Sequence, residues 1–159
     1  LTWNPWNKFK FGQSYAVISY GLTSKFDFHS YISYHADSNI TVYYGLFYQF
    51  LDLKKLHLAT AIGMRKNINS NWNHLFLPQL LFTSFINDKY SLGGSFVNVI
   101  NLTKNYNYGI AMDLSFFYKT KIKTKAIESV SIGLGIFRPT TWEPKNYFLP
   151  TYSIDIKFK

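Results

Sequence analysis

The stretch from Tyr106 to Lys119 alternates between two chemically different sets of side chains. Its odd-numbered positions are mostly small or polar, whereas its even-numbered positions are all apolar or aromatic: Tyr106, Tyr108, Ile110, Met112, Leu114, Phe116 and Tyr118. This period of two predicts a β-strand with one apolar face. At roughly 3.3 Å per residue and a tilt of about 40°, the part of that face from Tyr108 to Phe116 spans roughly 20 Å of depth, close to the apolar band of a transmembrane barrel.

Similar segments recur along the chain, separated by turn residues, and give nine expected strands in all. The other eight are Ser14–Leu22, Phe26–His35, Ile40–Leu51, Leu56–Arg65, Leu75–Ile86, Tyr90–Asn101, Ala126–Phe137 and Tyr147–Lys159. Bacterial barrels normally contain an even number of strands. We therefore expect residues 1–13 to form a tenth strand, an interfacial anchor or a plug, unless one strand is miscounted. The predicted fold is a single all-β domain over residues 1–159, an antiparallel up-and-down transmembrane β-barrel of 8–10 strands.

The chain contains no run of about 18 apolar residues, so the sequence predicts no transmembrane helix. A closed barrel is the other structure that satisfies every backbone polar group in lipid. Aromatic residues make up 20% of the sequence, which is typical of proteins whose rings line a membrane interface. The expected girdle residues are Tyr20, Tyr34, Tyr106, Tyr108, Phe116, Tyr118 and Phe158.

A soluble, lipocalin-like barrel with its apolar face inward is the alternative fold. No charged residue stands on the apolar face of seven of the nine segments, but both lipid and a soluble core would exclude charge. The opposite face distinguishes better between a soluble barrel and a membrane barrel. It is mostly Gly, Ala, Ser and Asn, whereas a face in water would be rich in Lys and Glu. This composition favours the narrow interior of a membrane barrel.

The segment Leu75–Ile86 is apolar on both faces and is interrupted by Pro78, which predicts a bulge or a bend. Counting alternate positions places Phe76, Leu80 and Phe82 on its inner side. Packing inside a small barrel is the expected role of these side chains. Alternatively, they line an apolar ligand pocket, pack against a plug formed by residues 1–13, or contact a partner protein.

The inner face is predicted to carry charged and titratable side chains of both signs. The expected polar set of the lumen is Asp27, His29, His57, Arg65, Asp113 and Asp155. Such a set can relay protons or catalyse a reaction, but inward charges also pair with one another because unpaired burial is costly. The self-paired structural network is the favoured interpretation. A Ser–His–Asp set from Ser33, His29 and Asp27 would require side chains on one strand to converge, so no catalytic residue is assigned.

The net charge is +9 and cysteine is absent. Most lysines fall in turns or at strand ends, where they are expected to contact membrane lipids, including lipopolysaccharide phosphates, and not nucleic acid. Without cysteine there is no disulfide framework and no thiolate metal site. The histidines show no ligand spacing, so we predict no metal site and no cofactor.

Two sets of residues carry resemblances to known proteins. The pattern Tyr20–Asp27, with the C-terminal aromatic Phe158, resembles small Gram-negative outer-membrane barrels of the OmpX, OmpA and OmpW kind, although the terminal Lys159 departs from it. The segment Asn71–Pro78 is similar to part of the lipid A palmitoyltransferase PagP. The rest of that family's catalytic set has no counterpart here, so no site is transferred.

These observations predict a mature chain of the bacterial outer membrane, with its signal peptide removed. The favoured function is non-enzymatic: a structural protein, a narrow channel or a partner-binding component of the envelope, with a protein partner or oligomer expected in the last case. The alternative is a lipid-modifying enzyme of the acyltransferase or deacylase type. The inward His, Asp and Ser residues favour it, and so does the fifth strand, which is apolar on both faces.

Overall fold

The computed structural model describes residues 2–4, 10–35, 40–68, 74–139 and 148–159, and all the regular structure in these residues is β-strand. The strands are β1 (Thr2–Asn4), β2 (Lys10–Gly21), β3 (Phe26–His35), β4 (Ile40–Leu53), β5 (Leu56–Asn67), β6 (Leu75–Phe76), β7 (Gln79–Phe85), β8 (Tyr90–Asn101), β9 (Tyr106–Lys119), β10 (Ile127–Arg138) and β11 (Leu149–Phe158). Among the described residues, no helix has the length and apolar character needed to cross a membrane.

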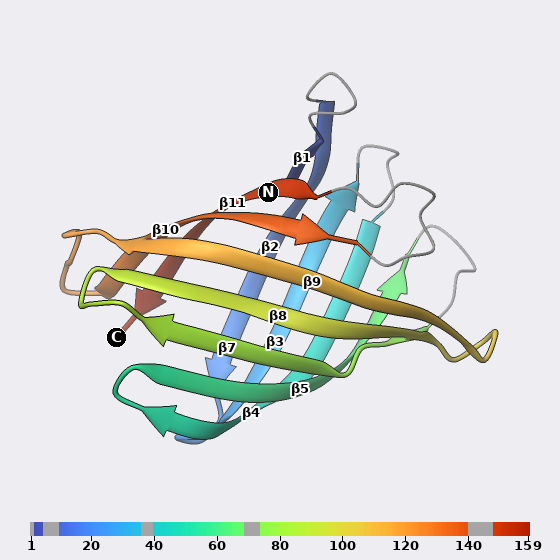
Figure 1. Cartoon of the computed structure of the whole chain (residues 1–159), viewed down its shortest axis with the longest axis horizontal. Coiled ribbons are helices and arrows are strands. Elements are labelled where there is room, and N and C mark those ends of the chain that lie inside the picture. Colours follow the sequence, from blue (N-terminus) through green and yellow to red (C-terminus); the bar gives the residue numbers. More distant parts are fainter. Residues whose placement is uncertain (1, 5–9, 36–39, 69–73, 140–147) are drawn as a thin grey trace.

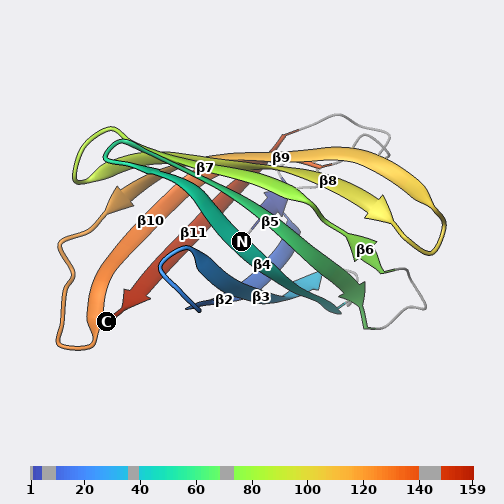
Figure 2. The ribbon, with the colours of Figure 1, turned by 90° about the horizontal axis from the view of Figure 1, so that it is seen from below.

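The strands form one antiparallel sheet that curls into a barrel. Its order is β4-β3-β2-β1-β11-β10-β9-β8, followed by β6 and β7, which pair with both β8 and β5. The additional pairing of β4 with β5 closes the ring. In Figure 1, β8–β10 form the near wall and β2–β4 the far wall, and Figure 2 shows the same two walls from below. The predicted antiparallel up-and-down barrel of 8–10 strands is therefore confirmed.

The ring has ten strand positions, because β6 and β7 occupy one position between β5 and β8. The tenth position is filled by β1, which lies between β2 and β11. Thr2 is in register with Gln13 on one side and with Thr151 on the other. Residues 1–13 were expected to form a strand, an anchor or a plug; of those described, Thr2–Asn4 form β1 and Lys10–Gln13 begin β2.

Pro78 divides the expected fifth strand. Leu77 and Pro78 separate β6 from β7, because proline has no N–H to donate to a neighbouring strand. The bend expected at this position is confirmed, but the expected orientation of the strand is wrong.

The pairing with β5 decides which side chains of β6 and β7 face outward. Phe76 pairs with Met64, Leu80 with Thr60, and Phe82 with Leu58. These partners belong to the outer face of β5, so Phe76, Leu80 and Phe82 also face outward. Because this segment is apolar on both sides, only the cross-strand register identifies its inner face.

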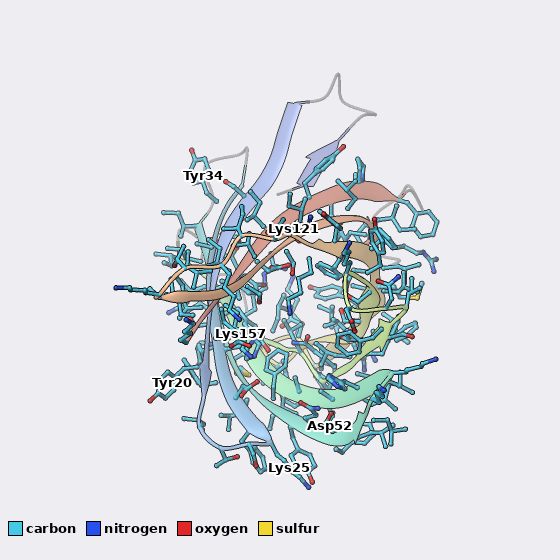
Figure 3. All side chains as sticks on the ribbon, turned by 90° about the vertical axis from the view of Figure 1, so that its left-hand side faces the viewer. Tyr20, Lys25, Tyr34, Asp52, Lys121 and Lys157 are labelled. Carbon is cyan, nitrogen blue, oxygen red and sulfur yellow. The ribbon has the colours of Figure 1, made fainter. Side chains whose placement is uncertain are left out.

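The outer face of the barrel is an apolar belt exposed along its length. The exposed fraction is 73% for Ile18, 56% for Leu134 and 71% for Ile154. Figure 3 shows Tyr20 and Tyr34 projecting away from the barrel. By contrast, the apolar side chains that are most buried include Tyr43, Ala61 and Ala111, which lie on the inner face. The apolar surface of this fold therefore faces outward, as it does in a protein surrounded by lipid.

The connections differ in length at the two ends of the barrel. One end carries the turns at residues 22–25, 54–55 and 86–89 and the basic connector 120–126. The other end carries the connections at residues 36–39, 68–74, 102–105 and 139–148. We refer to the first as the short-turn end.

We predict that a charge is tolerated on the connector but not on the belt. Leu134 and Ile122 have nearly equal exposed fractions, 56% and 55%, but only Leu134 lies on the belt. In lipid vesicles, Leu134→Lys should lower the free energy of unfolding by about 2–4 kcal/mol, and Ile122→Lys by less than about 1 kcal/mol. Guanidinium unfolding measures both values. Equal effects of the two substitutions would contradict a lipid-facing belt.

Candidate functional site in the barrel lumen

A cavity of about 230 Å³ lies in the lumen of the barrel. Eight strands contribute to it, from β2 round to β10. Its lining residues are Val17, His29, Ser30, Tyr31, Tyr43, Phe47, Arg65, Leu77, Gln79, Val97, Val99, Ala111 and Phe137. We call this level of the barrel the waist. At about 30 Å³ per molecule, the cavity has room for about eight waters.

Aromatic rings cover much of the wall around the waist. The ring of Tyr31 stacks on that of Tyr43, with centroids 4.9 Å apart, and His29 stacks on Phe47 at 3.7 Å. Both are cross-strand pairs between β3 and β4, where stacking is worth a few tenths of a kcal/mol to about 1 kcal/mol. These two pairs hold four rings against one another on the inner face of β3 and β4.

Glycines allow large rings to lie flat on the inner wall. A Cβ atom on Gly133 would come within 2.7 Å of the ring of Phe117, and one on Gly93 within 3.2 Å of the same ring. Gly93 and Gly133 lie on the two neighbours of β9, the strand that carries Phe117. The small residues of the inner face thus form recesses into which neighbouring rings fit.

Asp27 and His29 lie near each other, and His29 also contacts a serine that the sequence did not indicate. His29 Nδ1 is 3.0 Å from Ser19 Oγ, and His29 Nε2 is 3.9 Å from Asp27 Oδ2. A carboxylate that orients a catalytic imidazole approaches to about 2.6–3.2 Å. The Asp27–His29 distance is longer than this, so these three residues have the geometry of a loose polar contact. Ser19 could be found only from the pairing of β2 with β3.

The two other predicted aspartates each interact with a serine. Asp113 accepts a hydrogen bond from Ser95, which is its register partner on β8. Asp155 accepts a longer one, 3.4 Å, from Ser153 on the same strand. Neither interaction connects to the Asp27–His29 pair.

His57 lies at the short-turn end, away from the waist. Its Nε2 is 2.9 Å from Oδ1 of Asp52, the register partner on β4, and its ring meets that of Phe85 edge-on at 4.7 Å. Arg65, in contrast, lines the waist cavity together with His29. The structure therefore brings His29 and Arg65 to the same cavity and places the remaining predicted residues in separate local pairs.

An ion pair at the short-turn end was not among the expected sites. Lys157 Nζ is 3.0 Å from Glu128 Oε2, and the two residues lie on neighbouring strands β11 and β10. Both side chains are well exposed, so the pair contributes little to stability. Many other lysines are in turns at this end, including Lys25, Lys54 and Lys121. Their contact with lipid phosphates stays a prediction.

Most of the expected girdle aromatics are on the exposed outer surface. The exposed fractions are 68% for Tyr20, 48% for Tyr34, 42% for Phe116, 36% for Tyr118 and 66% for Phe158. Whether they lie at a membrane interface stays a prediction.

Tyr106 is exposed as well, at 55%, whereas Tyr108 is half-buried beside a β-bulge that interrupts the alternation of β9. Val99 pairs with Gly109, but the next residue, Ile100, pairs with Asn107. The chain turns through Gly109, whose φ is 92°, a conformation that glycine adopts readily. Beyond the bulge Tyr106 is in register with the fully buried Asn101, whose Nδ2 donates to the Tyr108 hydroxyl at 2.9 Å. The strict alternation that placed Tyr106 and Tyr108 on the outer face holds from Gly109 onward and is broken at Tyr108.

Within the described part of the chain, no three His, Asp or Glu side chains gather closely enough to hold a metal ion. Most of the predicted titratable groups that the structure describes interact with one neighbour each, and the cavity lining also includes several apolar side chains, such as Val97 and Phe137.

Comparisons with known proteins show the fold. No protein-family model matches the chain, and no curated protein matches its sequence. Among solved structures, a KdgM porin is similar to it with a TM-score of 0.60 and 11% sequence identity, over 92% of this chain and 75% of that chain. This likeness supports an antiparallel barrel of the outer-membrane type. Similarity to OmpX, OmpA, OmpW or PagP in particular is not shown.

We predict that the Ser95–Asp113 hydrogen bond stabilises the barrel. Ser95→Ala removes the donor from a half-buried carboxyl group and should lower the free energy of unfolding by about 1–3 kcal/mol. Ser153→Ala is the matched control, because its bond to Asp155 is long and exposed, and it should change stability by less than about 0.5 kcal/mol. Guanidinium unfolding in vesicles measures both, and an effect of Ser95→Ala no larger than that of the control would contradict the assignment.

Proposed function

We propose that this protein is a narrow channel of the bacterial outer membrane. The observation that carries the proposal is the waist cavity, which eight strands line from both walls of the barrel. Around it the outer face is apolar and exposed, while the inner face offers small residues, rings and paired polar groups. In such a barrel solutes pass through the interior, and the exterior is in contact with lipid.

The orientation in the membrane follows from the connections. In outer-membrane barrels the short turns face the periplasm and the longer loops face the outside. The short-turn end of this barrel, which also carries the C-terminal end of β11, is then periplasmic. The solved structure to which this fold is similar is that of a porin, the KdgM porin, and this supports the channel proposal.

The lipid-modifying alternative has less support from the residues. It requires a nucleophile, a base and an orienting group within hydrogen-bond distance of one another. The nearest approach to such a set is Ser19, His29 and Asp27, in which the histidine–aspartate distance is 3.9 Å. A channel requires only that the lumen remain open to water.

Two tryptophan substitutions on adjacent residues of β9 test the channel. Ala111 lines the waist cavity, whereas Ile110 is 51% exposed on the outer face. We expect refolded protein to give discrete conductance steps in planar bilayers, and Ala111→Trp to reduce the step by about twofold or more, because pore width limits conduction. Ile110→Trp should leave the step unchanged.

Folding of each variant is checked by its heat-modifiable migration on gels. Absence of conductance in the folded wild-type protein would overturn the proposed function. Equal loss in the Ala111→Trp and Ile110→Trp variants would show that current does not pass through the lumen.

A further inference from the structure

Two glycines on neighbouring strands form a recess at the waist. Gly45 on β4 and Gly63 on β5 are register partners on the inner face. The ring of Tyr43 lies over both of them. A Cβ atom on Gly63 would overlap Cε2, Cζ and the hydroxyl of Tyr43, and these are its three nearest atoms. At Gly45 the backbone is also close, since a Cβ atom would be 2.8 Å from the carbonyl oxygen of Ile62.

A hydrogen bond holds the far end of this ring. The Gln79 amide donates from Nε2 to the Tyr43 hydroxyl at 2.8 Å. Gln79 is on β7, which is the neighbour of β5, so the Tyr43 side chain runs from β4 across β5 towards β7. Tyr31 stacks beside it with an angle of 13° between the ring planes. The ring lies over the two glycines of the wall, and the residue is 3% exposed.

Glycine within a strand is unfavourable unless something approaches its backbone closely. Its extra conformational freedom costs about 0.5–1 kcal/mol relative to alanine. Two glycines in register at one point, under one ring that is also hydrogen-bonded, indicate a position built to hold that ring. The cavity borders on Tyr43, so a ring that leaves the recess takes up space within the waist.

We propose that Tyr43 sets the bore of the channel. The recess of Gly45 and Gly63 and the hydrogen bond from Gln79 hold its ring back against the wall, which keeps the waist open. A ring released from the recess swings into the cavity and narrows the path. This inference rests on the proposed channel function and assigns the residue that regulates it.

A double-mutant cycle in planar bilayers tests the proposal. Gly63→Ala evicts the ring and should lower the single-channel conductance by about twofold or more. Gly63→Ala combined with Tyr43→Ala should conduct at least as well as the wild type, because no ring remains to be displaced. Gly21→Ala is the matched control. A Cβ atom there meets only Asp27 Oδ1, at the ordinary contact distance of 3.5 Å, so conductance should not change.

The cycle separates this proposal from the proposed function and from a purely structural role. If the folded wild-type protein does not conduct, the channel function itself fails. If the wild type conducts but Gly63→Ala has no effect, or has the same effect with and without Tyr43, the assignment of Tyr43 is overturned. If the ring only covers the glycine backbone, Gly63→Ala should change the unfolding midpoint and leave the conductance unchanged.

A second variant covers the case in which Gly63→Ala does not fold. Gln79→Leu keeps the volume of the side chain but removes the hydrogen bond to Tyr43. We expect it to add brief partial closures to the current trace, and the same substitution in a Tyr43→Ala background to show none. Closures that persist without Tyr43, or a trace identical to that of the wild type, would overturn the proposal.

Discussion

Closure of the sheet is the constraint on which the rest of this structure depends. In a bilayer each unpaired backbone N–H or C=O costs several kcal/mol, so a spanning sheet must have no free edge. An antiparallel ring closes only with an even number of strand positions, and nine long strands would leave two neighbours parallel. The three residues of β1 stand in the tenth position, and Thr2 is in register with both β2 and β11. Within the described part of the chain only these three residues join β2 to β11, so the long strands depend on a short segment at this point of the ring.

A closed barrel of ten positions has a narrow interior, and the inner side chains follow from that width. Glycine and serine are placed where a ring from a neighbouring strand must lie flat, as Phe117 does over Gly93 and Gly133. Several polar groups pair locally, as Ser95 does with Asp113 and His57 with Asp52, whereas the buried Ser33 hydroxyl has no hydrogen-bond partner among the described residues. Local pairing leaves the waist lined by fixed side chains, and this is what a passive channel requires.

The sequence predicted the strands well because lipid and lumen impose opposite chemistry on alternate residues. It also predicted the break at Pro78, where the cause is a single missing N–H. The sequence was a poor guide where the direction of a side chain depends on the register between neighbouring strands. β1 is too short to show alternation, the bulge beside Gly109 interrupts the alternation of β9, and the doubly apolar strand hides the outward direction of Phe82. The Gly45–Gly63 recess and the Ser19–His29 contact also require pairing that no single strand reveals.

The most direct measurement of the central claim is cysteine accessibility in lipid vesicles. The chain contains no cysteine, so single substitutions at Ser131, Ile132, Ser153 and Ile154 on β10 and β11 can be labelled without background. A water-soluble maleimide should react at Ser131 and Ser153, which face the lumen, and not at Ile132 and Ile154, which face lipid. A lipid-phase quencher should give the reverse pattern with a fluorescent label. Equal labelling at all four positions would contradict a membrane barrel with a water-filled lumen.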